Sequence, residues 1–165
     1  FILIPPSPDP TLNWNFPVQN GPRNRQQVTI GISRGGRTTK IHALVDVLGR
    51  PLRLVLTPGN KSDVKGADLL IGETIGMKRV IADRGYDANR IRAALREQGT
   101  IPVIPGRRNR KRPIQYDERR YKDRWRVEAM FCRLKDFRRI ATRYDKLARN
   151  FLSAVSLAAA VAFWL

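Results

Sequence analysis

Residues 39–57 read TKIHALVDVLGRPLRLVLT, two apolar runs separated by a short polar stretch. The runs Thr39–Val47 and Leu52–Thr57 are rich in Val, Leu, Ile and Thr, which favour an extended backbone on a half-buried sheet. The four residues between them, Leu48-Gly49-Arg50-Pro51, include glycine and proline and suit a tight connection. The stretch therefore predicts an antiparallel hairpin, with Asp46 as a turn residue ahead of Gly49.

Downstream of this hairpin the pattern alternates between helices and strands. It predicts a helix from Ser62 or Asp63 to about Ile75, a strand over Arg79–Ala82, a helix from an Asp87 N-cap to Gly99, a strand over Ile101–Ile104, a long helix from about Glu118 to Phe137, and a last helix from near Lys146. This order indicates an α/β fold in which helices flank a mixed sheet.

The two ends of the chain differ from its middle. Six prolines fall within residues 1–27, and proline fixes φ and removes a hydrogen-bond donor, so only Phe1–Ile4 suits a short strand there. We expect residues 1–27 to be irregular and not native to the domain, which would span residues 28–165. The apolar run Phe151–Leu165 is shorter than the roughly 20 residues that span a bilayer, so we expect a buried helix and no membrane partner.

The composition is strongly basic. The chain has 32 Lys and Arg against 14 Asp and Glu, a formal net charge of +18. Such a charge opposes compact folding unless a polyanion relieves it, and nucleic acid is the common partner; the alternative is a merely basic, soluble protein. The one cysteine, Cys132, excludes an internal disulfide and fits core packing in a reducing compartment. One His and one Cys also exclude a zinc finger.

Two carboxylates stand out by position. Asp83 ends a short apolar strand and precedes a glycine turn, where functional side chains of open α/β sheets collect; the alternative is a turn cap. Glu128 is an acid among bases on the predicted long helix. Helical spacing aligns it with the other members of a Y-x2-R-x3-E-x6-K pattern, namely Tyr121, Arg124 and Lys135.

The pattern on the long helix has two interpretations. One is an ordinary ladder of surface ion pairs. The other gives Glu128 a place near the sheet, because it neighbours the apolar Val127 and Phe131. Carboxylates from separate elements can hold Mg²⁺ ions for phosphodiester chemistry, while flanking cations grip the phosphates. The basic loop 107–113 suits such backbone contacts through Arg107, Arg108, Arg110, Lys111 and Arg112, unless it is simply a flexible, solvated loop.

The spacing Y-x2-R-x3-E-x6-K resembles the signature of insertion-sequence transposases of the IS4/IS5 type, in the DDE class. Four further segments agree in order: GISRGGRTTKIH at 31–42, LTPG at 56–59 with Asp63 following, IADRGYD at 81–87, and FRRIATRYD at 137–145. PVIP at 102–105 agrees as well. The resemblance covers roughly residues 28–165 and implies a ribonuclease H-like fold.

The resemblance also implies roles for particular residues. Asp83 matches the second catalytic Asp and Glu128 the catalytic Glu, both as metal ligands. Tyr121, Arg124 and Lys135 match accessory residues that contact DNA ends or steady the site. The implied activity is Mg²⁺-dependent cleavage of transposon ends, with Mn²⁺ able to substitute, followed by strand transfer into target DNA. A homodimer assembled on DNA and a bacterial cytoplasmic, nucleoid-associated location are implied with it.

One member of the pattern is not evident. Transposases of this class carry a first catalytic Asp on the opening strand, upstream of the SRGG stretch. Asp9 stands at about the right distance, but Pro8 and Pro10 flank it, and a central strand tolerates proline poorly. The chain is therefore expected to be an altered transposase domain, inactive if no third acid replaces the missing one. The alternatives are a non-catalytic DNA-binding remnant and a basic RNA-binding protein.

Overall fold

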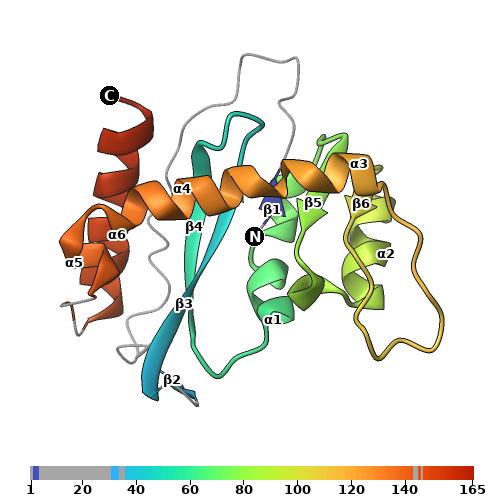
Figure 1. Ribbon diagram of the computed structural model, residues 1–165, viewed down its shortest axis with the longest axis horizontal. Helices are drawn as coiled ribbons and strands as arrows, with labels where there is room; N and C mark the ends of the chain where they lie inside the picture. Colours follow the sequence, from blue (N-terminus) through green and yellow to red (C-terminus); the bar gives the residue numbers. More distant parts are fainter. Residues whose placement is uncertain (1, 4–30, 34–35, 143–144, 146) are drawn as a thin grey trace.

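The computed structural model describes residues 2–3, 31–33, 36–142, 145 and 147–165 (Figure 1). Asp9 and residues 4–27 of the predicted irregular segment lie outside the described residues. The strands are β1 Ile2–Leu3, β2 Gly31–Ser33, β3 Gly36–Val45, β4 Pro51–Pro58, β5 Arg79–Ala82 and β6 Ile101–Val103. The α-helices are α1 Asp63–Asp68, α2 Asn89–Glu97, α3 Glu118–Tyr121, α4 Trp125–Lys135, α5 Arg138–Ala141 and α6 Ala148–Phe163. Short 3₁₀ turns are η1 Ile71–Thr74, η2 Arg84–Tyr86 and η3 Lys122–Arg124.

The predicted hairpin is confirmed. Strands β3 and β4 pair antiparallel from Thr39 opposite Pro58 to Val45 opposite Pro51. Asp46 organises the connection, because its carboxylate accepts hydrogen bonds from the backbone N–H groups of Leu48 and Arg50, both at 2.9 Å. Asp46 is therefore the turn residue that the sequence predicts.

The described strands form a mixed sheet in the order β4-β3-β1-β5-β6, and β2 pairs with the beginning of β3. Strand β5 runs parallel to β6, while β1 runs parallel to β3 and antiparallel to β5. The position between β3 and β5 is thus held by the two residues Ile2 and Leu3. The mixed sheet flanked by helices agrees with the predicted α/β class.

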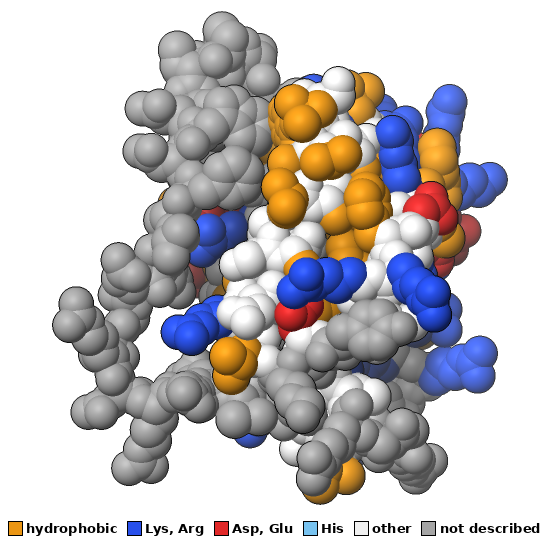
Figure 2. Space-filling model, turned by 90° about the vertical axis from the view of Figure 1, so that its left-hand side faces the viewer, with side chains coloured by type: hydrophobic (Ala, Val, Ile, Leu, Met, Phe, Trp, Pro, Cys, Tyr) orange, Lys and Arg blue, Asp and Glu red, His pale blue; other side chains and the backbone are white. Residues whose placement is uncertain are grey.

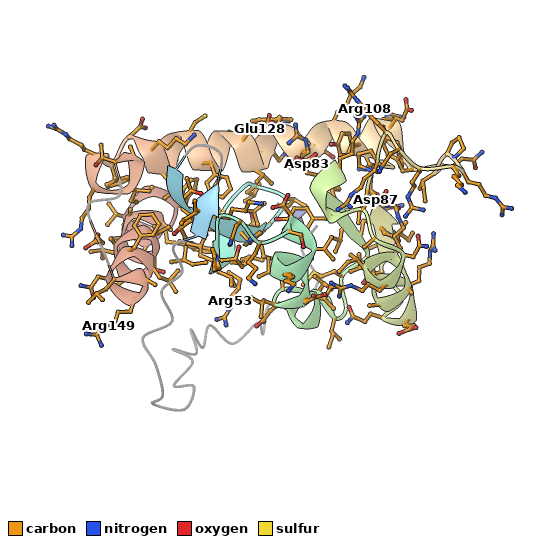
Figure 3. The ribbon with its side chains drawn as sticks, turned by 90° about the horizontal axis from the view of Figure 1, so that it is seen from below. Arg53, Asp83, Asp87, Arg108, Glu128 and Arg149 are labelled. Atoms are coloured by element: carbon orange, nitrogen blue, oxygen red, sulfur yellow. The ribbon has the colours of Figure 1, made fainter. Side chains whose placement is uncertain are left out.

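Successive side chains along the strands point to opposite faces of the sheet, and each face packs into its own hydrophobic core. Ala43, Val45 and Ile81 pack with α4 and α6, whereas Leu44, Val80 and Ala82 pack with α1 and α2. Figure 3 shows the α3–α4 rod on one side of the strands and the green helices α1 and α2 on the other. On α4 and α6 the residues that face the first core are Val127, Met130, Leu134, Phe151, Val155 and Ala158. This arrangement lays α4 beside β1 and the preceding turn η3 beside β5.

Helix α6 is a core helix, as its composition predicts, with an exposed outer side. Phe151 and Val155 are buried, but Leu157, Val161 and Leu165 are exposed, and Figure 2 shows apolar side chains gathered on this face. None of the helices among the described residues is long and apolar enough to cross a bilayer.

The structure differs from the predicted elements in several places. The helix predicted from 62 to 75 is split into α1 and the 3₁₀ turn η1, where Gly72 weakens a continuous α-helix and the Thr74 hydroxyl bonds the Ile71 carbonyl. The helix predicted from 118 to 137 contains the tighter turn η3. Cys132 is exposed, so the predicted core role is wrong. Strand β2 and helix α5 were not predicted.

Candidate active site

Asp83 lies where strand β5 ends and the turn η2 begins. Its carboxylate accepts a hydrogen bond from the Arg84 backbone N–H at 2.7 Å, so it caps the turn while remaining partly exposed. The side chain is thus held at the carboxyl end of a strand, where a crevice residue is expected. Asp83 therefore caps the turn and still exposes part of its carboxylate to solvent.

Glu128 lies in the first turn of α4 and is more exposed than the sequence indicates. Its side chain is 55% exposed, although we expected it to lie near the sheet because it neighbours Val127 and Phe131. The helix buries Val127 and turns Glu128 away from the core, because adjacent residues are about 100° apart around a helix. The expectation that Glu128 is shielded from solvent is therefore wrong.

Arg124 brings the two carboxylates together. Its Nη2 donates to Oε1 of Glu128 at 2.7 Å, and its Nη1 lies 4.0 Å from Oδ2 of Asp83. Tyr121 completes the group, because its hydroxyl lies 3.5 Å from Oδ1 of Asp83 and its ring lies 5.7 Å from the Arg124 guanidinium. Figure 3 shows Asp83 and Glu128 along the same edge of the molecule. Four predicted site residues, from the end of β5 and from α3, η3 and α4, therefore converge.

Lys135 is not part of this group. It ends α4, seven residues beyond Glu128, which corresponds to roughly 10 Å along the helix axis. Its side chain is exposed on the outer surface of α4. Lys135 therefore lies apart from the two carboxylates.

The two predicted metal ligands of the site are Asp83 and Glu128. Asp83 and Glu128 offer the hard oxygen donors that Mg²⁺ prefers, so the residues fit the ion in type. Across the described ranges, no three His, Cys, Asp or Glu side chains are grouped to hold a metal ion. Both carboxylates also face Arg124, which partly neutralises them. The pair therefore offers oxygen donors of the type that a Mg²⁺ site would need.

Three buried side chains, His42, Tyr86 and Thr57, are linked by hydrogen bonds and support the turn that begins at Asp83. Nδ1 of His42 on β3 lies 2.7 Å from the Tyr86 hydroxyl of η2, and Nε2 lies 2.7 Å from Oγ1 of Thr57 on β4. Burial lowers the pKa of His42 to about 4, so the imidazole is neutral at pH 7. His42 therefore has a structural role, with both ring nitrogens held by hydrogen bonds. The sequence carried no signal for its partner Tyr86, 44 residues away.

A pocket of about 290 Å³ opens beside these hydrogen-bonded side chains. Its lining includes Asp83, Lys40 and Asp63, and Nζ of Lys40 donates to Oδ1 of Asp63 at 2.8 Å. The remaining lining residues are Ile41, His42 and Tyr86. Lys40 and Asp63 compensate each other's charge, so the pocket adds no net charge to the Asp83 side of the site.

Replacing Gly66 with Ala is expected to destabilise this region by about 1–3 kcal/mol. A Cβ at position 66 would lie 2.4 Å from the His42 ring, which cannot retreat without losing its bonds to Thr57 and Tyr86. Gly72→Ala is the matched control, because a Cβ there meets nothing within 4 Å. Urea unfolding of both variants tests this, and equal stability of the two would contradict the close packing of Gly66 on His42.

The basic loop lies between β6 and α3, beside the Asp83 turn. Two of its five predicted DNA contacts are engaged within the protein. Arg110 forms an ion pair with buried Asp87, and Arg107 donates to the Gly85 carbonyl at 2.9 Å. Asp87 is therefore not the predicted N-cap of α2, a position that Ala88 occupies. Arg108, Lys111 and Arg112 are exposed.

Fold and site together define a strongly basic α/β domain with two carboxylates bridged at its sheet edge. The chain belongs to the transposase DDE-domain family, whose model matches residues 19–163. It is 41% identical over 132 residues to a Brucella ovis protein described as a transposase for insertion sequence element IS6501, covering 78% of this chain and 98% of that protein.

A second relative is a Burkholderia cepacia protein described as a transposase for insertion sequence element IS402. It is 36% identical over 121 residues, which cover 67% of this chain and 55% of that protein. No solved structure matches the chain. The predicted class, an insertion-sequence DDE transposase, is confirmed, and membership assigns the chain a role in transposition. The IS4/IS5 type stays a prediction.

Proposed function

We propose that this chain cuts DNA at the ends of an insertion sequence and joins them to target DNA, with Asp83 and Glu128 as its carboxylates. The observation that carries the proposal is the convergence of these two acids on Arg124 from separate elements. The mixed sheet that places them would be of the ribonuclease H-like type. A homodimer formed on DNA, at the bacterial nucleoid in the cytoplasm, belongs to the same proposal.

Each site residue has a definable part in this proposal. Asp83 and Glu128 would hold Mg²⁺ or Mn²⁺, which when bound activates an attacking oxygen and stabilises a leaving one. Arg124 pairs with both acids and is free to turn to a phosphate when they are otherwise neutralised. Tyr121 steadies Asp83 from α3, and Lys135 extends the cationic surface along the DNA.

A second candidate function is a non-catalytic DNA-binding remnant. The observation that favours it is the strand between β3 and β5, where the two residues Ile2 and Leu3 carry no carboxylate. A domain with only two catalytic acids would bind DNA through its basic surface and cut it poorly. Asp9, the third-acid candidate, lies outside the described residues and remains a hypothesis.

A nicking assay separates the two candidates. The chain is incubated with duplex DNA carrying the ends of the element, in Mg²⁺, in Mn²⁺ and in EDTA. Cleavage that needs either ion supports the enzyme, and loss of that cleavage in Asp9→Ala would identify the third acid. DNA binding without cleavage in either ion would overturn the enzyme in favour of the remnant.

A further inference from the structure

Asp87 is a buried carboxylate that gathers the basic loop. Its side chain is fully buried, and Oδ1 accepts from Nε and Nη2 of Arg92 at 3.0 and 2.9 Å. From the loop, Arg110 donates through Nε to Oδ2 at 2.6 Å and through Nη2 to Oδ1 at 3.0 Å. The backbone N–H of Arg107 donates to Oδ2 at 2.8 Å. Asp87 thus holds both ends of the stretch 107–110.

The charge state of Asp87 suits this task. Burial alone would raise its pKa, but the hydrogen bonds from Arg110, the Arg107 backbone and Arg92 outweigh burial and lower the pKa to about 2. Asp87 is therefore ionised at neutral pH, and each of its contacts is a charge-assisted hydrogen bond.

The same network reaches the turn that carries Asp83. The turn η2 spans Arg84–Tyr86, with Asp83 at its beginning and Asp87 at its end. The Asp87 backbone N–H donates to the Arg84 carbonyl at 3.1 Å, and the Arg107 side chain donates to the Gly85 carbonyl at 2.9 Å. The loop and the Asp83 turn therefore share one set of hydrogen bonds.

The five cations of the loop then fall into two groups. Arg110 is only 24% exposed, and withdrawing it to meet a phosphate would leave a buried carboxylate short of partners, which is a costly exchange. Arg108, Lys111 and Arg112 are exposed. Figure 3 shows Arg108 directed away from the body of the molecule and Asp87 inside it. These three exposed side chains can therefore reach a ligand without breaking the hydrogen bonds around Asp87.

We propose that Asp87 is a positioning residue that joins the basic loop to the Asp83 turn, and that Arg108, Lys111 and Arg112 are the loop's contacts to DNA phosphates. Arg107 and Arg110 hold the loop in shape. The phosphate assignment rests on the proposed DNA-processing function, whereas the joining role rests on the contacts of Asp87 alone.

Two charge-preserving substitutions test the proposal. Lysine keeps the charge of Arg110 but cannot form its forked pair with Asp87, whereas Arg149→Lys changes an exposed arginine of α6 that lies outside the loop. We expect Arg110→Lys to weaken binding to a labelled DNA duplex by about threefold or more, because a loosened loop loses its fixed contacts. Arg149→Lys should remain within about twofold of the unchanged chain. Equal affinities for the two variants would overturn the claim that Arg110 holds the loop in its DNA-binding shape.

Amide hydrogen exchange of the free protein supplies a readout that needs no DNA. In Arg110→Lys, but not Arg149→Lys, exchange should quicken both in residues 105–112 and in the Asp83 turn, residues 84–87. Faster exchange confined to the loop would overturn the joining role. If exchange quickens both in the loop and in the Asp83 turn, the joining role of Asp87 is supported. If the unchanged protein then binds no DNA duplex, the phosphate assignment and the proposed function are both overturned.

Discussion

Glu128→Gln and Asp83→Asn are each expected to lower Mg²⁺-dependent nicking of insertion-sequence ends by about a thousandfold or more. Each change removes a charged oxygen donor from a site that has few, and several kcal/mol of transition-state stabilisation correspond to about three orders of magnitude in rate. The double variant should be no slower than either single one, because the two acids act as a unit. Single-turnover nicking of an end-labelled duplex measures all three rates.

DNA affinity provides the internal check on this prediction. Both substitutions remove a negative charge from the proposed DNA-processing site, so DNA binding should stay equal or become tighter while cleavage fails. Glu118→Gln is the matched control, because Glu118 is an exposed acid in α3 outside the bridged pair. Its nicking rate should stay within about twofold of the unchanged chain. Equal losses in the control and in Glu128→Gln would contradict the assigned pair.

Lowering the pH from 7 to 4.5 is expected to reduce the free energy of unfolding by roughly 2–3 kcal/mol through His42 alone. Burial lowers the folded-state pKa of His42 from 6.5 to about 4, so between these values the unfolded chain binds the extra proton. The contribution is fully present above pH 6.5 and is lost as the pH falls toward 4. Asp87 adds a separate loss only below its ordinary pKa of 3.8, toward about 2.

The chain has one histidine, which makes this prediction easy to assign. Urea unfolding across this pH range should show the loss in the unchanged chain and a flatter profile in His42→Gln, which is less stable at pH 7 but has no imidazole to protonate. A single imidazole titrating near pH 4 by NMR would agree. Parallel stability profiles for the two proteins would contradict the neutral, buried state of His42.

The elements that the sequence predicts well are those set by local pattern. The hairpin follows from two β-rich runs around Gly49, and Asp83 follows from a strand that ends before a glycine turn. The pairing of Arg124 with Glu128 also follows, because four-residue spacing aligns side chains on a helix. These features depend on neighbours within a few residues, which a sequence displays directly.

The features that sequence reasoning missed depend on distant partners. Asp87 has the position and residue type of an N-cap, but its carboxylate is bound by Arg110, 23 residues away, and buried by the fold. Tyr86 gains its role from His42, 44 residues away. The exposure of Glu128 and Cys132 depends on how far α4 is rotated over the sheet, and apolar periodicity gives that rotation only coarsely.

The central proposal, that Asp83 and Glu128 hold the metal ion of the site, is tested most directly by calorimetric titration of Mn²⁺ into the DNA-free protein. The unchanged chain and Glu118→Gln should bind Mn²⁺ alike, and Asp83→Asn and Glu128→Gln should each lose that binding. Identical Mn²⁺ binding by all four proteins would contradict the claim, because the ion would then be held by groups other than this pair.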